Sequence, residues 1–285
     1  MKNRIYNIWF ITPLVVIFII LFILPTVISF FFSLTVWNLT EFRFVGLYNF
    51  ITFFSEYSLN IGIKNTLLYS ILTCGFKAVI ALGLAVLLTS PIKSKHIVRS
   101  IVYFPNLVST VAVGLAFSSL MHPTRGLFNT LLAGFGIEGP DWLGNSNLAL
   151  FSVIFTDVWK GLGVATVIYI AGLQGISETY YEAAAIDGAG GFQRFRHITL
   201  PLVRSSMNSV IILAFIGGIR SFELIWTMTK GGPGFATDTL ASIIYKQYAS
   251  GFFGLSTAGN VIMFILIIVL VFPLYRFIIS REVDL

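Results

Sequence analysis

The sequence predicts an all-α integral membrane protein with six transmembrane helices and a helical loop on the cytoplasmic side. Only 11% of the 285 residues are charged, 56% are hydrophobic, and the mean hydropathy is +0.90. Soluble domains carry about 25% charged residues. Long apolar runs also recur along the chain, and a helical span needs about 20 such residues. A soluble globular domain is therefore excluded.

The first apolar run is the longest. Residues 5–40 contain no charged side chain, whereas the apolar core of a signal peptide has roughly 7–15 residues. We therefore expect a first span followed by an amphipathic continuation, and no cleaved signal. Pro13 is expected near the start of this helix and Pro25 at a kink.

Five further apolar runs predict the remaining spans, at about residues 66–88, 106–120, 149–173, 203–228 and 256–279. The connections are short and no internal repeat is visible, so we predict one transmembrane domain over residues 1–285. Cys74 is the single cysteine. It cannot form an internal disulfide and is interpreted as a small buried side chain.

The distribution of Lys and Arg predicts the orientation. With six spans, both termini and two of the loops share one side. That side holds 10 of the 18 basic residues, the opposite loops hold five, and three lie within spans. Since positive residues favour the cytoplasmic side, both termini are expected in the cytoplasm. The formal charge of +6 follows largely from this bias, and no nucleic-acid partner is expected.

The cytoplasmic segment 177–201 is expected to form two short helices. The spacing Thr179-x-x-Glu182 is that of a capping box, and the alanines that follow are strong helix formers. Gly188 is placed to end the first helix in a left-handed cap. The second helix is expected over 192–198, and Pro201 fits the first turn of the next span.

Two interpretations of this segment follow from the residues alone. An alanine face allows close approach by a partner protein, to which Arg194, Arg196 and His197 offer charge. Alternatively, the segment is an interfacial helix pair whose arginines extend to lipid headgroups.

The same segment has the pattern EAA-x3-G-x9-I-x-LP and resembles the cytoplasmic signature of ABC-importer permease subunits. Further segments resemble carbohydrate permeases of the maltose and glycerol-3-phosphate type, namely GGPGFATDTL at 231–240, YFPN at 103–106 and GLFN at 126–129. The signature is matched at Glu182, Ala183, Ala184, Gly188, Ile198, Leu200 and Pro201.

This resemblance implies that the loop docks into a cytoplasmic ATPase subunit and transmits its motion. The implied coupling residues are Glu182, Ala183, Ala184, Gly188, Arg194 and Arg196. Glu182 would pair with a basic residue of the ATPase, and its capping role remains an alternative. The implied partners are a second related permease, two ATP-binding subunits, an extracytoplasmic solute-binding protein and membrane lipid. The implied location is a bacterial or archaeal cell membrane. Segment 231–240 is interpreted as a turn out of the fifth span, or as a contact with the solute-binding protein or the second permease.

No motif for catalysis is present. The chain lacks a Gly-Lys dipeptide and hence a P-loop, and His96, His122 and His197 have no metal-binding spacing. We predict a non-catalytic subunit without a metal or cofactor of its own, and expect ATP and Mg²⁺ in the separate ATPase.

Charges within the spans indicate a polar pathway or internal ion pairs. Asp157 and Lys160 share one helical face, as do Arg220 and Glu223, whereas Lys77 is alone and is as compatible with packing as with a pore. Either each pair neutralises itself and stabilises packing, or these residues line a pathway beside glycines that permit close passages. The family resemblance implies a pathway for a sugar, an oligosaccharide or a related polyol. Its predicted residues are Asn106, Thr110, Asp157, Lys160, Gly161, Gly217, Gly218, Arg220 and Ser221.

Three functions remain open at this point. The first is an ATP-driven importer permease, whose solute could be acidic or phosphorylated because Lys160 and Arg220 are cationic. The second is a secondary transporter or channel that uses the two charge pairs as an ion or proton relay. The third is a membrane anchor without transport activity.

Overall fold

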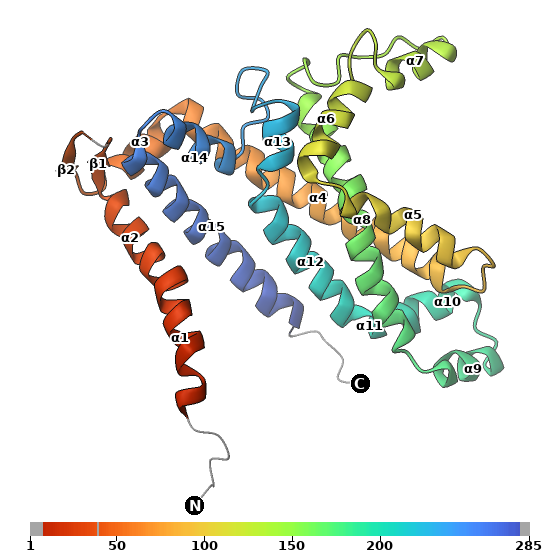
Figure 1. The fold of residues 1–285 in the computed structure, drawn as a ribbon. Coiled ribbons are helices and arrows are strands. Elements are labelled where there is room, and N and C mark those ends of the chain that lie inside the picture. Colours follow the sequence, from red (N-terminus) through yellow and green to blue (C-terminus); the bar gives the residue numbers. More distant parts are fainter. Residues whose placement is uncertain (1–7, 39, 280–285) are drawn as a thin grey trace, which may run out of the picture. The chain divides into compact units, whose positions relative to one another are not determined.

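The computed structural model describes residues 8–38 and 40–279, so Lys2, Arg4 and Arg281 of the predicted cytoplasmic termini lie outside the described residues. The predicted helical membrane fold is confirmed (Figure 1). The chain forms two compact units, which are described separately: residues 1–60 with 243–265, and residues 61–242 with 266–285. One domain over the whole chain stays a prediction.

Within the described ranges, four helices are long and apolar enough to cross a membrane. They are the continuous helix Thr12–Ser33, α4 (Tyr57–Thr89), α8 (Ala149–Gln174) and α15 (Phe253–Ile279). The first is built from α1 (Thr12–Phe18), a π-helical segment (Ile19–Ile23) and α2 (Leu24–Ser33). Two bent helix pairs pass the same test, which gives six spans if each pair is one span.

A β-hairpin follows the first span in the first unit, where the sequence predicted an amphipathic continuation. Strand β1 (Thr35–Trp37) pairs antiparallel with β2 (Phe42–Phe44). The Asn38 side chain accepts hydrogen bonds from the backbone N–H of Thr40 and Glu41, at 3.3 and 2.8 Å. Asparagine stabilises turns in this way, and the sequence pattern of apolar residues did not reveal it.

The hairpin is anchored by α3 (Tyr48–Ser55). The buried amide of Asn49 donates to the carbonyl oxygens of Ser33 and Thr35, both at 2.8 Å. Gly254, in the first turn of α15, lies so close to the Thr35 carbonyl that a β-carbon there would clash. The second half of α14 (Leu240–Ala249) belongs to the same unit, where Gly259 packs against Ile244.

In the second unit, the predicted third span is broken. Helix α5 (Lys95–Leu107) and α6 (Thr110–Leu120) meet at 99°. Val108 and Ser109 between them have extended backbone angles, with ψ of 139° and 136°. The predicted span 106–120 therefore corresponds to α6, and α5 was not predicted. Helix α5 mixes polar and apolar residues, so it does not form a continuous apolar run. Helix α7 (Leu127–Gly134) follows α6.

The predicted fifth span, 203–228, is also broken. It consists of α12 (Arg204–Ile219), a non-helical stretch at 220–222 and α13 (Glu223–Met228). A short helical run precedes it at an angle of 66°. That run is α10 (Gly191–Arg194), a π-helical segment (Phe195–Thr199) and α11 (Leu200–Leu202).

Two apolar clusters form the core of the second unit. One joins Tyr69, Phe117, Val153 and Ile225, and the other joins Leu88, Tyr169, Val203 and Val210. Together the two clusters therefore join α4, α6, α8, α12 and α13.

The segment 231–242 folds back onto α4. Thr237, Asp238 and Thr239 are fully buried. The amide nitrogen of Asn65 donates to the carbonyl oxygens of Phe235, Ala236 and Asp238, at 2.9–3.3 Å. The Asn65 side chain therefore ties this segment to α4 through three backbone carbonyls, of which that of Phe235 also accepts from the Asp238 N–H.

Replacing Asn65 with aspartate is expected to destabilise the protein by about 1–3 kcal/mol, because a carboxylate cannot donate to these buried carbonyls. The measurement is the thermal unfolding midpoint in detergent. The matched control is Asn60→Asp, since the Asn60 amide donates to the Phe54 carbonyl in an exposed hydrogen bond. Equal midpoints for the two variants would contradict the anchoring role.

Candidate coupling loop and solute pathway

The first helix of the predicted coupling loop is α9 (Glu178–Ile186). Its N-cap is Ser177, whose hydroxyl accepts a hydrogen bond from the Thr179 backbone N–H at 3.4 Å. The predicted capping box with Thr179 at the N-cap is therefore wrong, because the helix begins two residues earlier. Glu182 therefore does not cap the helix as the alternative proposed, and its side chain is exposed.

The C-terminus of α9 is as predicted. Gly188 has φ +75°. The backbone N–H of Gly188 donates to the Ala185 carbonyl at 3.1 Å, and that of Ala189 donates to the Ala184 carbonyl at 2.8 Å. This pair of bonds is the Schellman motif, which favours glycine at the left-handed position.

The second helix begins at Gly191, where the Gln193 side chain accepts from the Gly190 N–H at 2.8 Å. It continues through the π-helical segment, so it is longer than the predicted 192–198. The Tyr181 hydroxyl lies 3.0 Å from the hydroxyl of Thr199. Because Thr199 is buried, this contact fixes α9 to the base of the loop.

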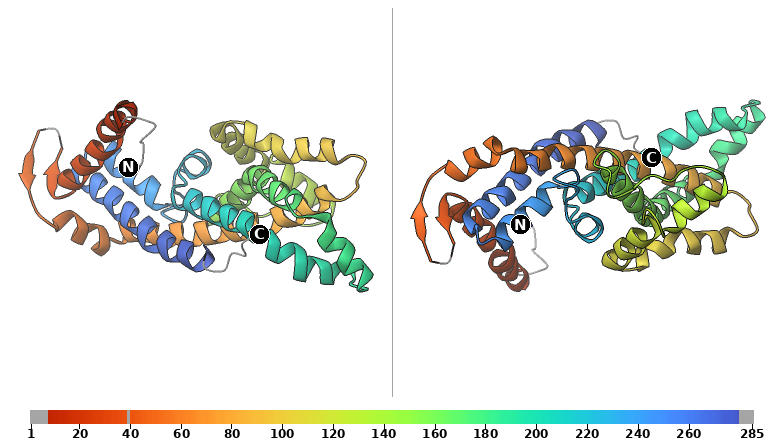
Figure 2. Two further views of the ribbon diagram at one scale, coloured as in Figure 1. Left: turned by 90° about the horizontal axis from the view of Figure 1, so that it is seen from below. Right: turned by 90° about the horizontal axis from the view of Figure 1, so that it is seen from above.

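The outer surface of the loop is open and partly apolar. Ala183 and Arg196 are exposed, and Ala184 and Arg194 are half-buried. Ile186 is 88% exposed and Phe192 is 73% exposed, although sequence reasoning did not single them out. Both are large apolar residues in a polar loop, and this could have indicated a contact surface from the sequence. In both views of Figure 2 the loop projects beyond the ends of α8 and α12, as expected for a docking element.

Four predicted pathway residues meet at one cavity of about 260 Å³. Thr110 begins α6, Asp157 lies on α8, and Arg220 and Ser221 occupy the break between α12 and α13. Phe222, Glu223 and Leu224 complete the lining. The cavity thus lies where two spans are interrupted, and interrupted helices of transporters typically surround their solute sites.

Asp157 forms an ion pair with Lys77 of α4, at 2.7 Å between Oδ2 and Nζ. Among the described residues, Asp157 does not pair with Lys160, and Arg220 does not pair with Glu223. The hypothesis of self-neutralising pairs is therefore wrong. Gly161 explains the pairing, since a β-carbon there would lie 2.6 Å from Cε of Lys77. The side chain of Lys77 therefore passes over Gly161, which sequence spacing could not show.

The other predicted pathway residues lie outside the lining of this cavity: Asn106, Lys160, Gly161, Gly217 and Gly218. Gly218 is buried against α4, where a β-carbon would lie 2.6 Å from Cα of Ser70. Gly217 faces open space. Sequence reasoning missed Tyr69, whose hydroxyl accepts from Ser221 at 3.2 Å.

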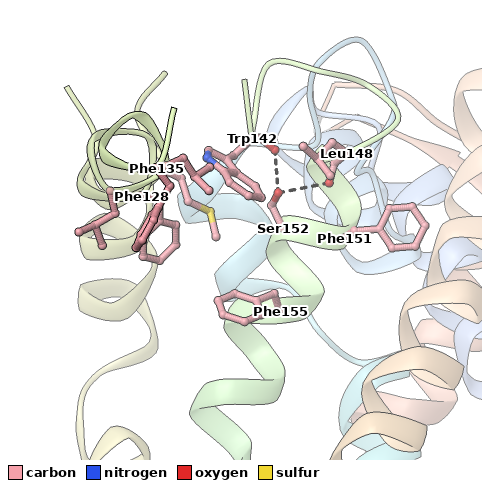
Figure 3. A pocket seen from close by; sticks show the side chains of 10 residues that line it. Phe128, Phe135, Trp142, Leu148, Phe151, Ser152 and Phe155 are labelled. Atoms are coloured by element: carbon pink, nitrogen blue, oxygen red, sulfur yellow. Dashed lines mark hydrogen bonds between the residues drawn. The ribbon is translucent and has the colours of Figure 1, made fainter. Parts of the chain in front are cut away.

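A different cavity, of about 470 Å³, lies near the opposite end of α8 from the coupling loop (Figure 3). Its lining is apolar except for Ser152, whose hydroxyl is engaged with the carbonyls of Trp142 and Leu148. Phe128, Phe135, Phe151 and Phe155 surround it. Such a cavity offers few hydrogen-bonding groups to a hydroxyl-rich solute, so the cavity at the helix breaks is the better candidate.

Comparison with known proteins identifies the family. The family model described as "binding-protein-dependent transport system inner membrane component" matches residues 77–283. The trehalose/maltose transport system permease protein MalF of Thermococcus litoralis is 33% identical over 260 residues, which cover 90% of this chain and 88% of that protein. The sn-glycerol-3-phosphate transport system permease protein UgpA of Escherichia coli is 32% identical, with 95% and 93% covered. The arabinooligosaccharides transport system permease protein AraP of Bacillus subtilis is 30% identical, with 91% and 84% covered.

Solved structures show the same fold. A bacterial ABC transporter involved in the import of the acidic polysaccharide alginate aligns with a TM-score of 0.83 at 23% identity. The alignment covers 94% of this chain and 93% of that chain. A chain of the MetNI methionine ABC transporter aligns with a TM-score of 0.57 at 17% identity, with 78% and 95% covered.

Proposed function

Since the chain belongs to the family of binding-protein-dependent transport system inner membrane components, we propose that it is a permease subunit of an ATP-driven importer for a sugar, an oligosaccharide or a related polyol. The main support for this proposal is the polar cavity at the two helix breaks, which is lined by Thr110, Asp157, Arg220 and Ser221. The names of the relatives MalF, AraP and UgpA support this class of solute.

The cavity offers hydroxyl, carboxylate and guanidinium groups within one small volume. Ser221 and Thr110 supply hydroxyls, and Arg220 and Glu223 supply opposite charges at the two edges of the helix break. Such groups donate to and accept from the hydroxyls of a sugar. Arg220 would also bind a carboxylate or phosphate group, so acidic sugars and phosphorylated polyols belong to the proposed class.

Energy for transport would come from two separate ATP-binding subunits that bind ATP and Mg²⁺. The coupling residues would be Glu182, Ala183, Ala184, Gly188, Arg194 and Arg196, with Ile186 and Phe192 as added apolar contacts. A second related permease and an extracytoplasmic solute-binding protein complete the proposed assembly. The coupling loop and both termini would face the cytoplasm.

Replacing Ile186 with serine is expected to release the ATP-binding subunit without unfolding the chain. Ile186 is 88% exposed, so its loss removes no internal packing. A buried apolar anchor at an interface typically contributes about 2 kcal/mol or more, which corresponds to a roughly thirtyfold weaker association. The measurement is the ATP-binding subunit retained on the tagged, detergent-solubilised complex.

The control is Ile137→Ser, because Ile137 is also exposed, at 54%, but lies near α7, away from the loop. We expect this variant to retain the ATP-binding subunit. Retention of that subunit by the Ile186 variant as well would remove Ile186 from the proposed interface. A wild-type chain that purifies without any ATP-binding subunit would refute the proposed function.

A further inference from the structure

We propose that Lys77 is a positioning residue of the solute pathway, which holds the Asp157 carboxylate in the cavity wall. Lys77 itself lies outside the lining of the cavity, whereas Asp157 is part of it. Lys77 therefore acts through Asp157 and does not contact the solute. This inference rests on the proposed function and assigns a role to a residue that the family signature does not include.

The contact between these two side chains is short and shielded. Lys77 Nζ lies 2.7 Å from Asp157 Oδ2, and the side chains are only 12% and 19% exposed. Lys77 reaches α8 at Gly161, where a β-carbon would lie within 3 Å of both Cε and Nζ. The glycine thus fixes the path of the lysine side chain, which in turn fixes the direction of the carboxylate.

A second polar contact extends this arrangement to the break between α12 and α13. Tyr69 is fully buried on α4, two helical turns before Lys77. Its hydroxyl accepts from Ser221 at 3.2 Å. The two pairs, Lys77 with Asp157 and Tyr69 with Ser221, form a group of polar side chains beside the cavity, and Asp157 and Ser221 of this group line it.

Stability alone is a poor explanation for this group. The desolvation cost of a buried ion pair is comparable to its electrostatic gain, and replacing both partners by neutral groups of similar size is often tolerated. Loss of only one partner is costly, because the remaining charge is buried alone. A charged acceptor, in contrast, binds a hydroxyl donor more strongly than a neutral one. The pair is therefore expected to matter for solute binding.

The test uses the assembled complex in proteoliposomes with the double variant Lys77→Met and Asp157→Asn. The probes are maltose, trehalose, arabino-oligosaccharides and glycerol 3-phosphate, of which the one imported by the wild type is used. We expect normal yield of the complex, a KM for uptake raised at least tenfold, and a maximal rate within about twofold of the wild type. The matched control is Lys64→Met, since Lys64 is an exposed lysine on the same helix, and its KM should be unchanged.

The single variant Lys77→Met separates the two roles of the lysine. Because it leaves Asp157 unpaired, it should reduce the yield of the complex, and the double variant should restore the yield but not the KM. A double variant with the KM of the wild type would overturn this proposal and leave Lys77 a packing residue. A wild-type complex that accumulates no sugar, oligosaccharide or polyol with ATP would instead refute the proposed function, and this proposal with it.

Discussion

Replacing Gly188 with tryptophan is expected to abolish solute uptake while the chain still inserts and folds. Gly188 has φ +75°, and nothing lies within 4 Å of the β-carbon position. The position is also exposed, so a side chain there starts into open space. It strains the left-handed backbone by about 1–2 kcal/mol and occupies the surface offered to the proposed ATPase partner. Uptake by proteoliposomes, with chain yield as the reference, is the measurement.

The control is Gly188→Asn, because asparagine tolerates the left-handed conformation and is small. We expect this variant to retain most of the wild-type uptake. Normal uptake by the tryptophan variant would contradict the coupling role of the loop. Equal loss in both variants would show that the partner surface tolerates no side chain at all at this position.

Replacing Gly218 with valine is expected to prevent folding of the second unit. A β-carbon at Gly218 would lie 2.6 Å from Cα of Ser70, which is backbone of α4. Backbone cannot rotate away as a side chain can, so α12 and α4 would have to separate. Overpacking typically reduces the free energy of unfolding by about 1–3 kcal/mol. Valine adds two methyl groups beyond the β-carbon, so we expect a loss at or above the upper end of that range. The expected result is little or no monodisperse protein after solubilisation.

Gly217 provides the neighbouring control. A β-carbon at Gly217 meets no atom within 4 Å, and the residue is exposed. Gly217→Val is therefore expected to fold with a yield close to that of the wild type. Both glycines were predicted pathway residues, and this comparison separates a packing position from an open one. Equal yields for the two variants would contradict the close packing of α12 on α4.

The sequence predicted features that depend on local chemistry. Apolar run length predicted α8 and α15 within a few residues, and it predicted the end of α4 but not its start at Tyr57. Gly188 was predicted as a left-handed cap because the Schellman motif has a strong local preference for glycine. The same reasoning failed for the start of α9, because Ser177 and Thr179 are both good N-caps and only packing distinguishes them.

Features that depend on contacts between distant segments could not be predicted. The ion pair of Lys77 with Asp157 joins residues 80 positions apart, whereas spacing rules only relate neighbours on one helix. The breaks at 108–109 and 220–222 interrupt apolar runs without a distinctive polar signal. The cavity itself could be predicted in part, since the family resemblance supplied Thr110, Asp157 and Ser221 while Tyr69 and Glu223 were missed as pathway residues.

The proposed energy source is tested most directly by solute accumulation in vesicles containing the assembled complex, with ATP and the ion gradients controlled independently. An ATP-driven importer is expected to keep accumulating solute when an uncoupler collapses the gradients at constant ATP, and to stop when ATP is removed. Accumulation that collapses with the uncoupler and survives the removal of ATP would contradict it, and would indicate a secondary transporter in which the charged residues of α8 and the helix break move ions or protons.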